Sequence, residues 1–292
     1  MDNVAAPPKR QKAITPKFLR YLCRQGTSKD PSKITSDAHD HAIDLIVGGF
    51  FFATRPCEIV KTPEPGKTKT LRIRNLTFRD RHQTVVRSNH PRLYSIAEFV
   101  TVTFDNQKNG QKSDSRTHRR TDDVWLCPAR RLARAVMRVL RHFPGADCDH
   151  LLCSTFDPKL CTTSLLTSNF TLTFLRNTCQ HYGAKDTFGF GPSEIGNRSL
   201  RSGAAMALFL MNHSTAKIMI LGRWSSDAFL VYIRPQVLEW TNCMSQDMIS
   251  FTSFLDVGFY DVASKTDPRT RSRLLPLNGG GAMQIPGFNL HG

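Results

Sequence analysis

The sequence lacks an uninterrupted apolar run able to span a bilayer, because a membrane-crossing helix needs about 20 predominantly apolar residues and no run approaches that length. It also lacks a lipidation signal and an isolated amphipathic basic helix, two features that hold basic proteins at a membrane surface. A membrane is therefore not an expected partner.

Paired cysteine motifs are missing as well. The eight cysteines include no Cys-x-x-Cys pair and follow no signal peptide, which predicts a reduced intracellular compartment without structural disulfides. Cys148, His150 and Cys153 lie close together, but a second ligand pair at standard zinc spacing is absent. We therefore interpret these three as loop residues and predict no metal site.

Acidic residues are scarce beside basic ones. The chain has 24 Asp and Glu against 40 Lys and Arg, a formal net charge of +16. An excess of this size is unusual in enzymes of small molecules and indicates a polyanionic partner, with nucleic acid as the first candidate. A generic RNA-binding protein would carry aromatic stacking motifs on strands, and no RNP-type sequence is present.

The length of 292 residues suffices for one large domain or two small ones, and a hydrophobic content of 40% can fill a core. Residues 1–13 are basic and rich in proline, which predicts a flexible arm with a basic run compatible with a nuclear-import signal. Residues 249–292 lack periodicity and predict a loosely ordered tail. The packed domain is expected at 14–248.

Within that domain the patterns predict a mostly helical α+β fold with a small antiparallel sheet. Strands are expected over Thr68–Asp80 and Phe99–Asp105, and Asn109-Gly110 favours a hairpin turn after the second strand. Capping signals and apolar periodicity predict the helices. They are a buried helix from Asp37 towards Arg55, then Pro128–Phe143, Thr167–Gly183, Ser202–Leu210, and a short helix from Ser214 to Gly222.

Arginines stand out on two of these helices. Arg55 ends a nearly all-apolar run, so it must be paired or face a polar cleft, and Glu58 is within helical reach to orient it. A purely structural Arg–Glu pair is the alternative. On the helix at 128–143, Arg130, Arg134 and Arg138 share a face with no glutamate, which fits either contact with DNA phosphates or a solvated surface.

The segment Asn197–Gln236 is the most informative part of the chain. It holds Arg198 and Arg201 at the start of one helical run, Arg223 behind a glycine, and Tyr232 in a further run. A guanidinium binds two phosphate oxygens at once and keeps its charge at working pH, so several can neutralise a pentacoordinate phosphate. A tyrosine hydroxyl can act as the nucleophile. The pattern is typical of phosphoryl transfer.

In order, these residues resemble the tyrosine recombinases, and within them the eukaryotic Crypton and DIRS-like transposon group. Phe52–Glu58 resembles the first arginine box, and Gln107–Lys112 resembles the lysine hairpin. Arg198–Arg201 resembles the His-x-x-Arg box, and Gly222-Arg223-Trp224 and Tyr232 follow in the family's order, with Arg223 nine positions before Tyr232.

The resemblance implies a DNA breaking and rejoining domain over 14–248. In it, Tyr232 attacks a phosphodiester of double-stranded DNA to give a 3′-phosphotyrosine, and Lys108 protonates the departing 5′ hydroxyl. Lys112 lies on the same hairpin and is expected to contact DNA. The catalytic residues implied are Arg55, Lys108, Arg198, Arg201, Arg223 and Tyr232. Glu58 and Trp224 are expected to support them.

The resemblance also implies self-association on DNA, a nuclear location, and no metal, nucleotide or other small-molecule cofactor. Family members usually carry an N-terminal clamp domain, and this sequence is expected to lack one. Arg198 stands where transposon relatives have histidine, and an arginine cannot accept a proton from the attacking hydroxyl. The alternative function is therefore a catalytically decayed, DNA-binding relict of such a transposon.

Overall fold

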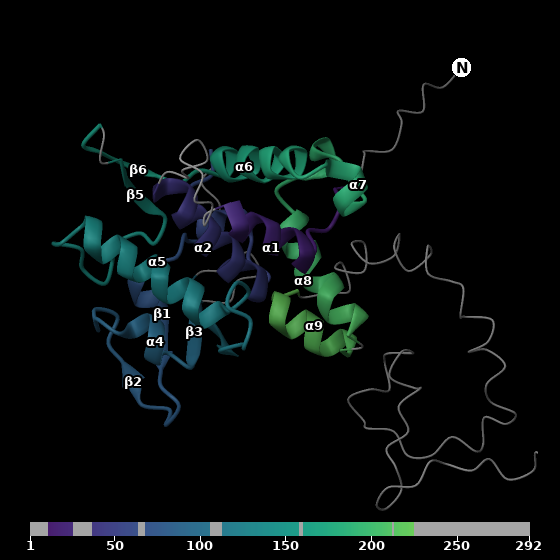
Figure 1. Cartoon of the computed structure of the whole chain (residues 1–292). Helices are drawn as coiled ribbons and strands as arrows, with labels where there is room; N and C mark the ends of the chain where they lie inside the picture. The colour runs from purple at the N-terminus through teal and green to yellow at the C-terminus, as the bar shows by residue number, and fades with distance from the viewer. Residues whose placement is uncertain are drawn as a thin grey trace, which may run out of the picture.

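A layer of helices packs on one face of a small antiparallel sheet, with further helices above and to one side (Figure 1). The structure is a computed structural model that describes residues 11–25, 37–63, 68–105, 113–157, 160–211 and 213–224. Within these residues the predicted α+β class, mostly helical with a small antiparallel sheet, is confirmed. No helix in the described ranges is long and apolar enough to cross a membrane.

The sheet has the strand order β2-β1-β3-β4, and every neighbouring pair is antiparallel. Side chains alternate along β3, so that Val100, Val102 and Phe104 enter the core while the residues between them are half-buried. Its strands are β1 (Leu76–Arg79), β2 (Val85–Val86), β3 (Phe99–Asp105) and β4 (Ser113–Arg119). A separate hairpin pairs β5 (Ser154–Asp157) with β6 (Thr162–Leu165).

The helices begin where the sequence supplies start signals. Helix α5 has proline at its first position, and the Thr167 hydroxyl accepts the Phe170 N–H at 3.1 Å at the start of α6. In chain order they are α1 (Pro16–Gln25), α2 (Asp37–Phe51), α3 (Pro56–Ile59), α4 (Leu93–Ile96), α5 (Pro128–His142), α6 (Ser168–His181), α7 (Ala184–Phe188), α8 (Ser199–Leu210) and α9 (Thr215–Gly222). Single 3₁₀ turns are η2 (Ile73–Asn75) and η3 (Pro192–Glu194).

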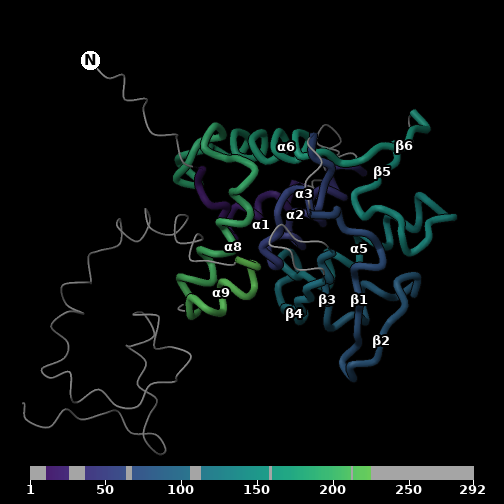
Figure 2. Tube along the Cα trace, turned by 180° about the vertical axis from the view of Figure 1, so that it is seen from behind, coloured from purple at the N-terminus to yellow at the C-terminus, as the bar shows by residue number. Residues whose placement is uncertain are grey.

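Helix α2 is the centre of the core. Its residues from His41 to Phe50 are all buried, and Gly48 lies so close to the Leu132 side chain of α5 that an added Cβ would stand 2.6 Å from it. Helix α5 in turn contacts β3 and β4, so the order of layers is α2, α5 and sheet. The view from behind shows the same stacking (Figure 2).

The N-terminal residues of the described chain are packed. The backbone N–H of Lys12 donates to Glu194 O at 2.8 Å, and that of Ile14 donates to Ser199 O at 3.0 Å. An added Cβ on Gly203 of α8 would stand 2.1 Å from Ile14 O, so this contact requires glycine. The last residues of the predicted arm, 11–13, therefore lie against the start of α8, and residues 1–10 are outside the described ranges.

Several predicted boundaries were wrong. The strand predicted over Thr68–Asp80 is extended only at Leu76–Arg79, because η2 interrupts it and the Asn75 side chain accepts the Arg72 N–H at 2.8 Å. The buried helix from Asp37 stops at Phe51, where Ala53 turns the chain with φ of 45°. Helix α8 begins three residues before the predicted Ser202. Helix α1 and the β5–β6 hairpin were not predicted.

Candidate functional site

Arginines from three distant segments meet around one buried glutamate. Arg55 precedes α3, Arg201 lies in the first turn of α8, and Arg223 follows α9. Glu58 of α3 bonds directly to Arg55 and Arg223. Arg201 bonds to the backbone carbonyls of Ala53 and Gly222, which lie close to those two arginines in the chain. The fold therefore assembles into one cluster residues that the sequence spreads over more than half of the chain.

The carboxylate of Glu58 is fully buried and holds two guanidinium groups. Its Oε1 accepts from Arg55 Nη1 at 2.9 Å, and its Oε2 accepts from Arg223 Nη2 at 2.7 Å. Oε2 also accepts the Arg55 backbone N–H at 2.7 Å, which caps α3. The predicted pairing of Glu58 with Arg55 is confirmed. Because the Arg55 side chain remains 22% exposed, its guanidinium can reach a bound anion.

Arg201 ties the turn after α2 to the end of α9. Its Nη1 donates to Ala53 O at 2.6 Å, and its Nη2 donates to Gly222 O. The guanidinium carbon lies 4.2 Å from the ring centroid of Trp224, a distance at which a cation is attracted to an aromatic face. Arg201 is only 6% exposed, so the two carbonyl groups and the Trp224 ring, instead of water, stabilise its positive charge.

Arg223 faces inward. Its side chain is completely buried, its Nη1 donates to Phe52 O at 3.0 Å, and its guanidinium lies 3.5 Å from the Phe104 ring centroid. Burial lowers the pKa of Arg223 to about 10, against the opposing attraction of Glu58. The predicted contact between Arg223 and a phosphate does not fit this placement, because the guanidinium would have to leave Glu58 and Phe104 to make it.

The backbone of Arg223 is in the left-handed region, with φ of 57° and ψ of 45°. A residue with a Cβ adopts this conformation at a free-energy cost of about 1–2 kcal/mol, so glycine usually occupies it. The sequence predicted that Gly222 would close α9, but Gly222 is the last helical residue and Arg223 makes the turn. The buried contacts with Glu58 offset this strain.

Gly222 is required by the ring of Trp224. An added Cβ would stand 1.6 Å from the ring, so Gly222→Ala must displace Trp224 from Arg201. We expect a loss of about 1–3 kcal/mol in the free energy of unfolding, as for other overpacked sites, measured by urea titration with tryptophan fluorescence. Gly145→Ala is the matched control, because nothing lies within 4 Å of the added Cβ there. Equal stability of the two variants would contradict this packing.

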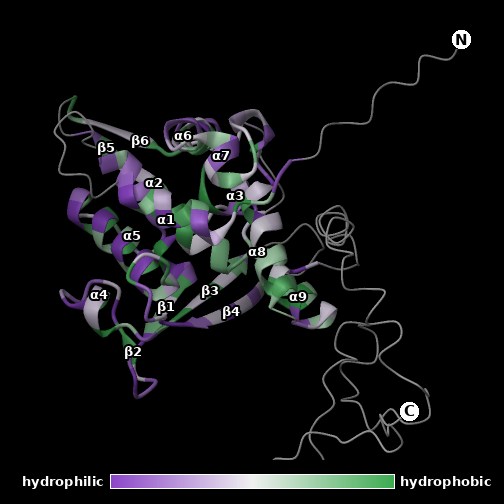
Figure 3. Ribbon diagram, turned by 45° about the vertical axis from the view of Figure 1, so that its right-hand side comes forward, coloured by the Kyte–Doolittle hydropathy of each residue, from purple (hydrophilic) through white to green (hydrophobic). Residues whose placement is uncertain are grey.

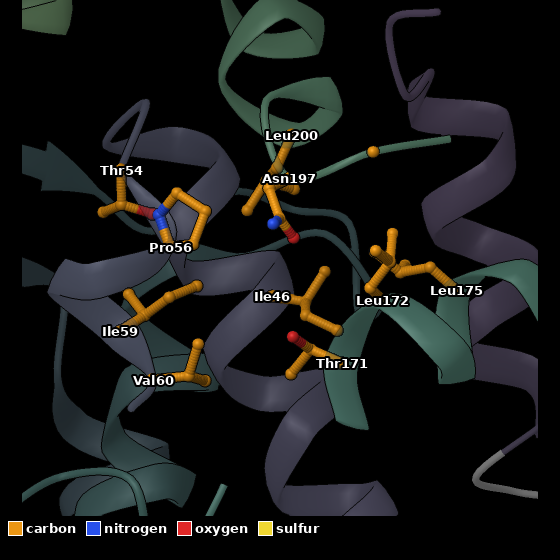
Figure 4. A pocket seen from close by; sticks show the side chains of 11 residues that line it. Ile46, Thr54, Pro56, Ile59, Val60, Thr171, Leu172, Leu175, Asn197 and Leu200 are labelled. Atoms are coloured by element: carbon orange, nitrogen blue, oxygen red, sulfur yellow. The ribbon is translucent and has the colours of Figure 1, made fainter. Parts of the chain in front are cut away.

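A small apolar cavity lies between α2, α3, α6 and the segment before α8, with Thr54 and Pro56 in its wall (Figure 4). Its volume is about 30 Å³, and Ile46, Ile59 and Leu175 form much of its wall, with Asn197 at one side. A space of this size holds a water molecule or two, not an organic substrate. The cluster of arginines is therefore the better candidate for the functional centre.

Neither a protein-family model nor a curated protein sequence matches this chain. Solved structures do match. The XerH site-specific recombinase bound to palindromic difH substrate, in its post-cleavage complex, superposes with a TM-score of 0.52 and 14% identity. The fold is that of a tyrosine recombinase. At this identity the likeness establishes the fold alone.

That match covers 84% of this chain and 56% of the XerH chain, so the chain spans little more than half the length of its neighbour. The XerH pre-cleavage complex with difH has a TM-score of 0.49 and 13% identity over the same shares. The Tn1549 transposon integrase in complex with transposon right end DNA has a TM-score of 0.41 and 12% identity, over 84% of this chain and 69% of that one.

Within the recombinase fold, the other predicted catalytic residues are placed as follows. Arg198 is exposed directly before α8, and its backbone N–H donates to Gln11 Oε1 at 2.9 Å. Its guanidinium makes no hydrogen bond or ion pair with any described residue. Strands β3 and β4 confirm the predicted hairpin, but Lys108 and Lys112 lie between them at 106–112, outside the described residues. Tyr232 also lies outside them.

The predicted DNA-facing arginines of α5 point largely towards protein. Arg134 Nη2 donates to Asp44 Oδ1 at 2.7 Å, and Arg138 Nη1 donates to Asp44 Oδ2 at 2.7 Å. Arg138 also pairs with Asp37 at 3.0 Å. Both acidic partners, Asp44 and Asp37, lie on α2. The absence of acidic residues on α5 therefore did not mean that its arginines are unpaired. Arg130 is half-buried, and its Nε and Nη1 find no partner in the described part of the chain.

Two features near the cluster were not predicted. His118 of β4 lies edge to face on the Phe52 ring at 4.6 Å, and burial lowers its pKa while a hydrogen bond to Phe51 opposes the shift. The second feature is the Phe104 ring, which makes a cation–π contact with the Arg223 guanidinium. The alternation of β3 marks Phe104 as a core residue, but no sequence signal indicates that its face meets a cation. Among the described residues no His, Cys, Asp and Glu side chains form a metal-binding group.

Proposed function

We propose that this protein is a site-specific recombinase that cleaves and rejoins double-stranded DNA through a covalent link to Tyr232. The observation that supports the proposal most directly is the meeting of Arg55, Arg201 and Arg223 around Glu58 in a tyrosine recombinase fold. The Glu58 carboxylate binds the guanidinium groups of Arg55 and Arg223, and Arg201 bonds to two backbone carbonyls, so these three arginines outnumber the carboxylate that they surround. A DNA phosphate would supply the missing negative charge.

In the proposed reaction the Tyr232 oxygen attacks phosphorus and the bond from phosphorus to the 5′ oxygen breaks. The products are a 3′-phosphotyrosine and a free 5′ hydroxyl, which takes its proton from Lys108. The tyrosine proton passes to solvent, because Arg198 cannot accept it. Arg55, with its exposed guanidinium, stabilises the charge that develops on the phosphate, and Arg201 adds to the positive field. Reversal on a second 5′ end rejoins the strand.

The finer assignment is to the recombinases of Crypton and DIRS-like transposons. The Gly222-Arg223-Trp224 sequence and the order of the arginine boxes support it. In this role the protein would assemble with further copies on DNA and work in the nucleus, where a basic chain with net charge +16 meets its polyanionic substrate.

A decayed, non-catalytic DNA-binding relict is the second candidate. Two observations favour it: an arginine stands in the first position of the Arg198–Arg201 box, and Arg223 is turned away from solvent. Both candidates predict binding to DNA, and only the enzyme predicts a covalent intermediate.

The deciding experiment is a covalent-adduct assay with nicked suicide duplexes whose half-sites are randomised, read on denaturing gels. We expect a protein–DNA adduct that disappears in Tyr232→Phe and persists in Tyr94→Phe, the matched control on α4. Salt-sensitive DNA binding without an adduct would support the relict instead. In that case Arg198→His tests whether a proton acceptor at this position restores cleavage.

A further inference from the structure

The sheet carries a second concentration of positive charge, at the edge away from the arginine cluster. Strand β4 borders α9, because Arg116 Nε donates to Ile220 O at 2.8 Å, and β2 is the strand at the opposite edge. The turns on either side of β2 project from the body of the molecule (Figure 2). We define the basic tip as Arg81, His82, Arg87, His90 and Arg92.

Within the described ranges, no carboxylate forms an ion pair with the basic tip. The sequence has no acidic residue between Asp80 and Glu98. Asp80 uses its Oδ1 to accept the backbone N–H groups of His82 and Thr84, each at 2.9 Å. Glu98 accepts from Arg119 Nε at 2.8 Å, so it too is bonded elsewhere. The hydrophilic loops flanking β2 are drawn in purple in Figure 3.

The arginines of the tip are free to bind. Arg81, Arg87 and Arg92 are all exposed. Within the described ranges Arg81 bonds only to the neighbouring His82, and the guanidinium groups of Arg87 and Arg92 have no hydrogen-bond or ion-pair partner. Several exposed arginines elsewhere pair with carboxylates, as Arg20 does with Asp123 at 2.8 Å and Arg119 does with Glu98 at 2.8 Å. The three arginines of the tip have no such pair within the described ranges.

Backbone hydrogen bonds hold the tip in one shape. The Asp80 N–H donates to Thr84 O at 3.0 Å, the Gln83 N–H donates to Asp80 O at 3.1 Å, and Gln83 turns the chain with φ of 65°. On the other side of β2, the His90 N–H donates to Arg87 O at 3.0 Å. A preformed display of cations binds with a smaller loss of conformational entropy than a flexible loop does.

We propose that the basic tip binds the phosphate backbone of duplex DNA as a contact separate from the arginine cluster. Four strands spaced by about 4.8 Å place β2 about 14 Å from β4, which is close to the 12 Å width of a DNA major groove. A duplex that lies along the sheet therefore brings one backbone to each edge. The contact rests on DNA being the partner, as in the proposed function, and does not require cleavage.

The test is the salt dependence of binding to a 30-base-pair duplex, because each phosphate contact contributes about −0.9 to the slope of log K against log salt. The variant Arg81→Gln, Arg87→Gln, Arg92→Gln should reduce the magnitude of the slope by about 2 to 3. The matched control Lys17→Gln, Arg24→Gln, Lys185→Gln removes the same charge from α1 and α7, far from β2 in Figures 1 and 2. It should leave the slope unchanged.

An equal reduction of the salt slope in the two triple variants would overturn the proposal, because it would show that net charge alone determines the slope. An unchanged slope in the tip variant would overturn it as well. Binding of single-stranded RNA in preference to the duplex, lost in the tip variant, would assign the surface to a different partner. The salt-dependence test does not depend on cleavage. The Tyr232→Phe variant should therefore show the same slope of log K against log salt as the wild type. Circular dichroism on both triple variants confirms that they are folded.

Discussion

Replacing Glu58 by glutamine is expected to lower the free energy of unfolding by about 3–5 kcal/mol, the range for removing one partner of a buried ion pair. Glu58 is fully buried and binds Arg55 and Arg223. Glutamine keeps the shape of the side chain but presents an amide donor to a guanidinium donor. Arg55 can turn towards water because it is 22% exposed, whereas the Arg223 side chain, at 0%, retains an uncompensated charge.

Urea unfolding of Glu58→Gln measures this loss, and Glu98→Gln is the control. Glu98 pairs with Arg119, whose side chain is 73% exposed, so its removal should change stability by less than about 1 kcal/mol. In the adduct assay, Glu58→Gln should also reduce cleavage at temperatures where it remains folded, because Arg55 loses the group that orients it. A Glu58→Gln variant as stable as Glu98→Gln would show that Arg223 is not held as described.

Replacing Asp44 by asparagine is expected to have an effect of similar size, about 3–5 kcal/mol. Asp44 is completely buried and accepts from Arg131 at 3.0 Å, Arg134 at 2.7 Å and Arg138 at 2.7 Å. Arg131 is itself buried, and among the described residues its only other side-chain hydrogen bonds are to Trp125 O and the Cys23 sulfur. All three arginines lie on α5, so removing the carboxylate of α2 leaves them close together without the negative charge that they share.

The contribution of Asp44 should also depend on pH. Burial raises the pKa of this carboxyl, but the combined attraction of Arg134, Arg131 and Arg138 outweighs it, so the folded-state pKa lies below the usual value. A carboxyl with a depressed pKa contributes its full stability above the unfolded pKa, and the contribution is lost as the pH falls through the folded value. The stability difference between the wild type and Asp44→Asn should therefore be constant near neutral pH and shrink in acid.

His41 affects the stability of the fold at higher pH than Asp44 does. Burial lowers its pKa to about 4, with Arg138 adding to the shift, so the folded state keeps this ring neutral while the unfolded chain takes up a proton. Stability therefore falls as the pH drops from the ordinary histidine pKa of about 6.5 to about 4, and Asp44→Asn keeps this fall because it removes only one of the charges that raise the His41 pKa. Unfolding at a series of pH values separates the two effects, with Asp149→Asn as the control because that side chain is 50% exposed. A difference that does not shrink below about pH 4, where His41 is protonated in the folded wild type, would contradict the assigned charge of Asp44.

The placement of Arg223 changes how the cluster is understood. Sequence order makes Arg223 a phosphate ligand, but the structure gives it a buried carboxylate and the Phe104 ring. Because Glu58 bonds to both Arg223 and Arg55, we expect Arg223 to act in the proposed reaction as a positioning residue for Arg55. Trp224, the next residue, packs on Arg201 instead. Two neighbouring residues of this segment thus contact the cluster in different ways: Arg223 reaches Arg55 through Glu58, and Trp224 packs on Arg201.

The sequence by itself determined those features that depend on neighbours along the chain. Proline at the start of α5 and the Ser214 cap of α9 satisfy helix ends within a few residues, so these helices were predictable. The spacing of Arg55 and Glu58 predicted their pairing because both lie on one turn. The order of the boxes indicated the recombinase fold, which the structure then confirmed.

Only the tertiary structure decided which charges face each other. Asp44 is separated from Arg131 by 87 residues and Glu58 from Arg223 by 165, so no local pattern shows that either pair exists. Arg134 and Arg138, on the predicted DNA face of α5, pair with Asp44 of α2. The basic tip at β2, which no motif marks, has no ion-pair partner among the described residues. Ion pairs form between groups that folding brings together, and burial makes the unpaired state costly, so the tertiary structure decides which arginines pair with a carboxylate and which do not.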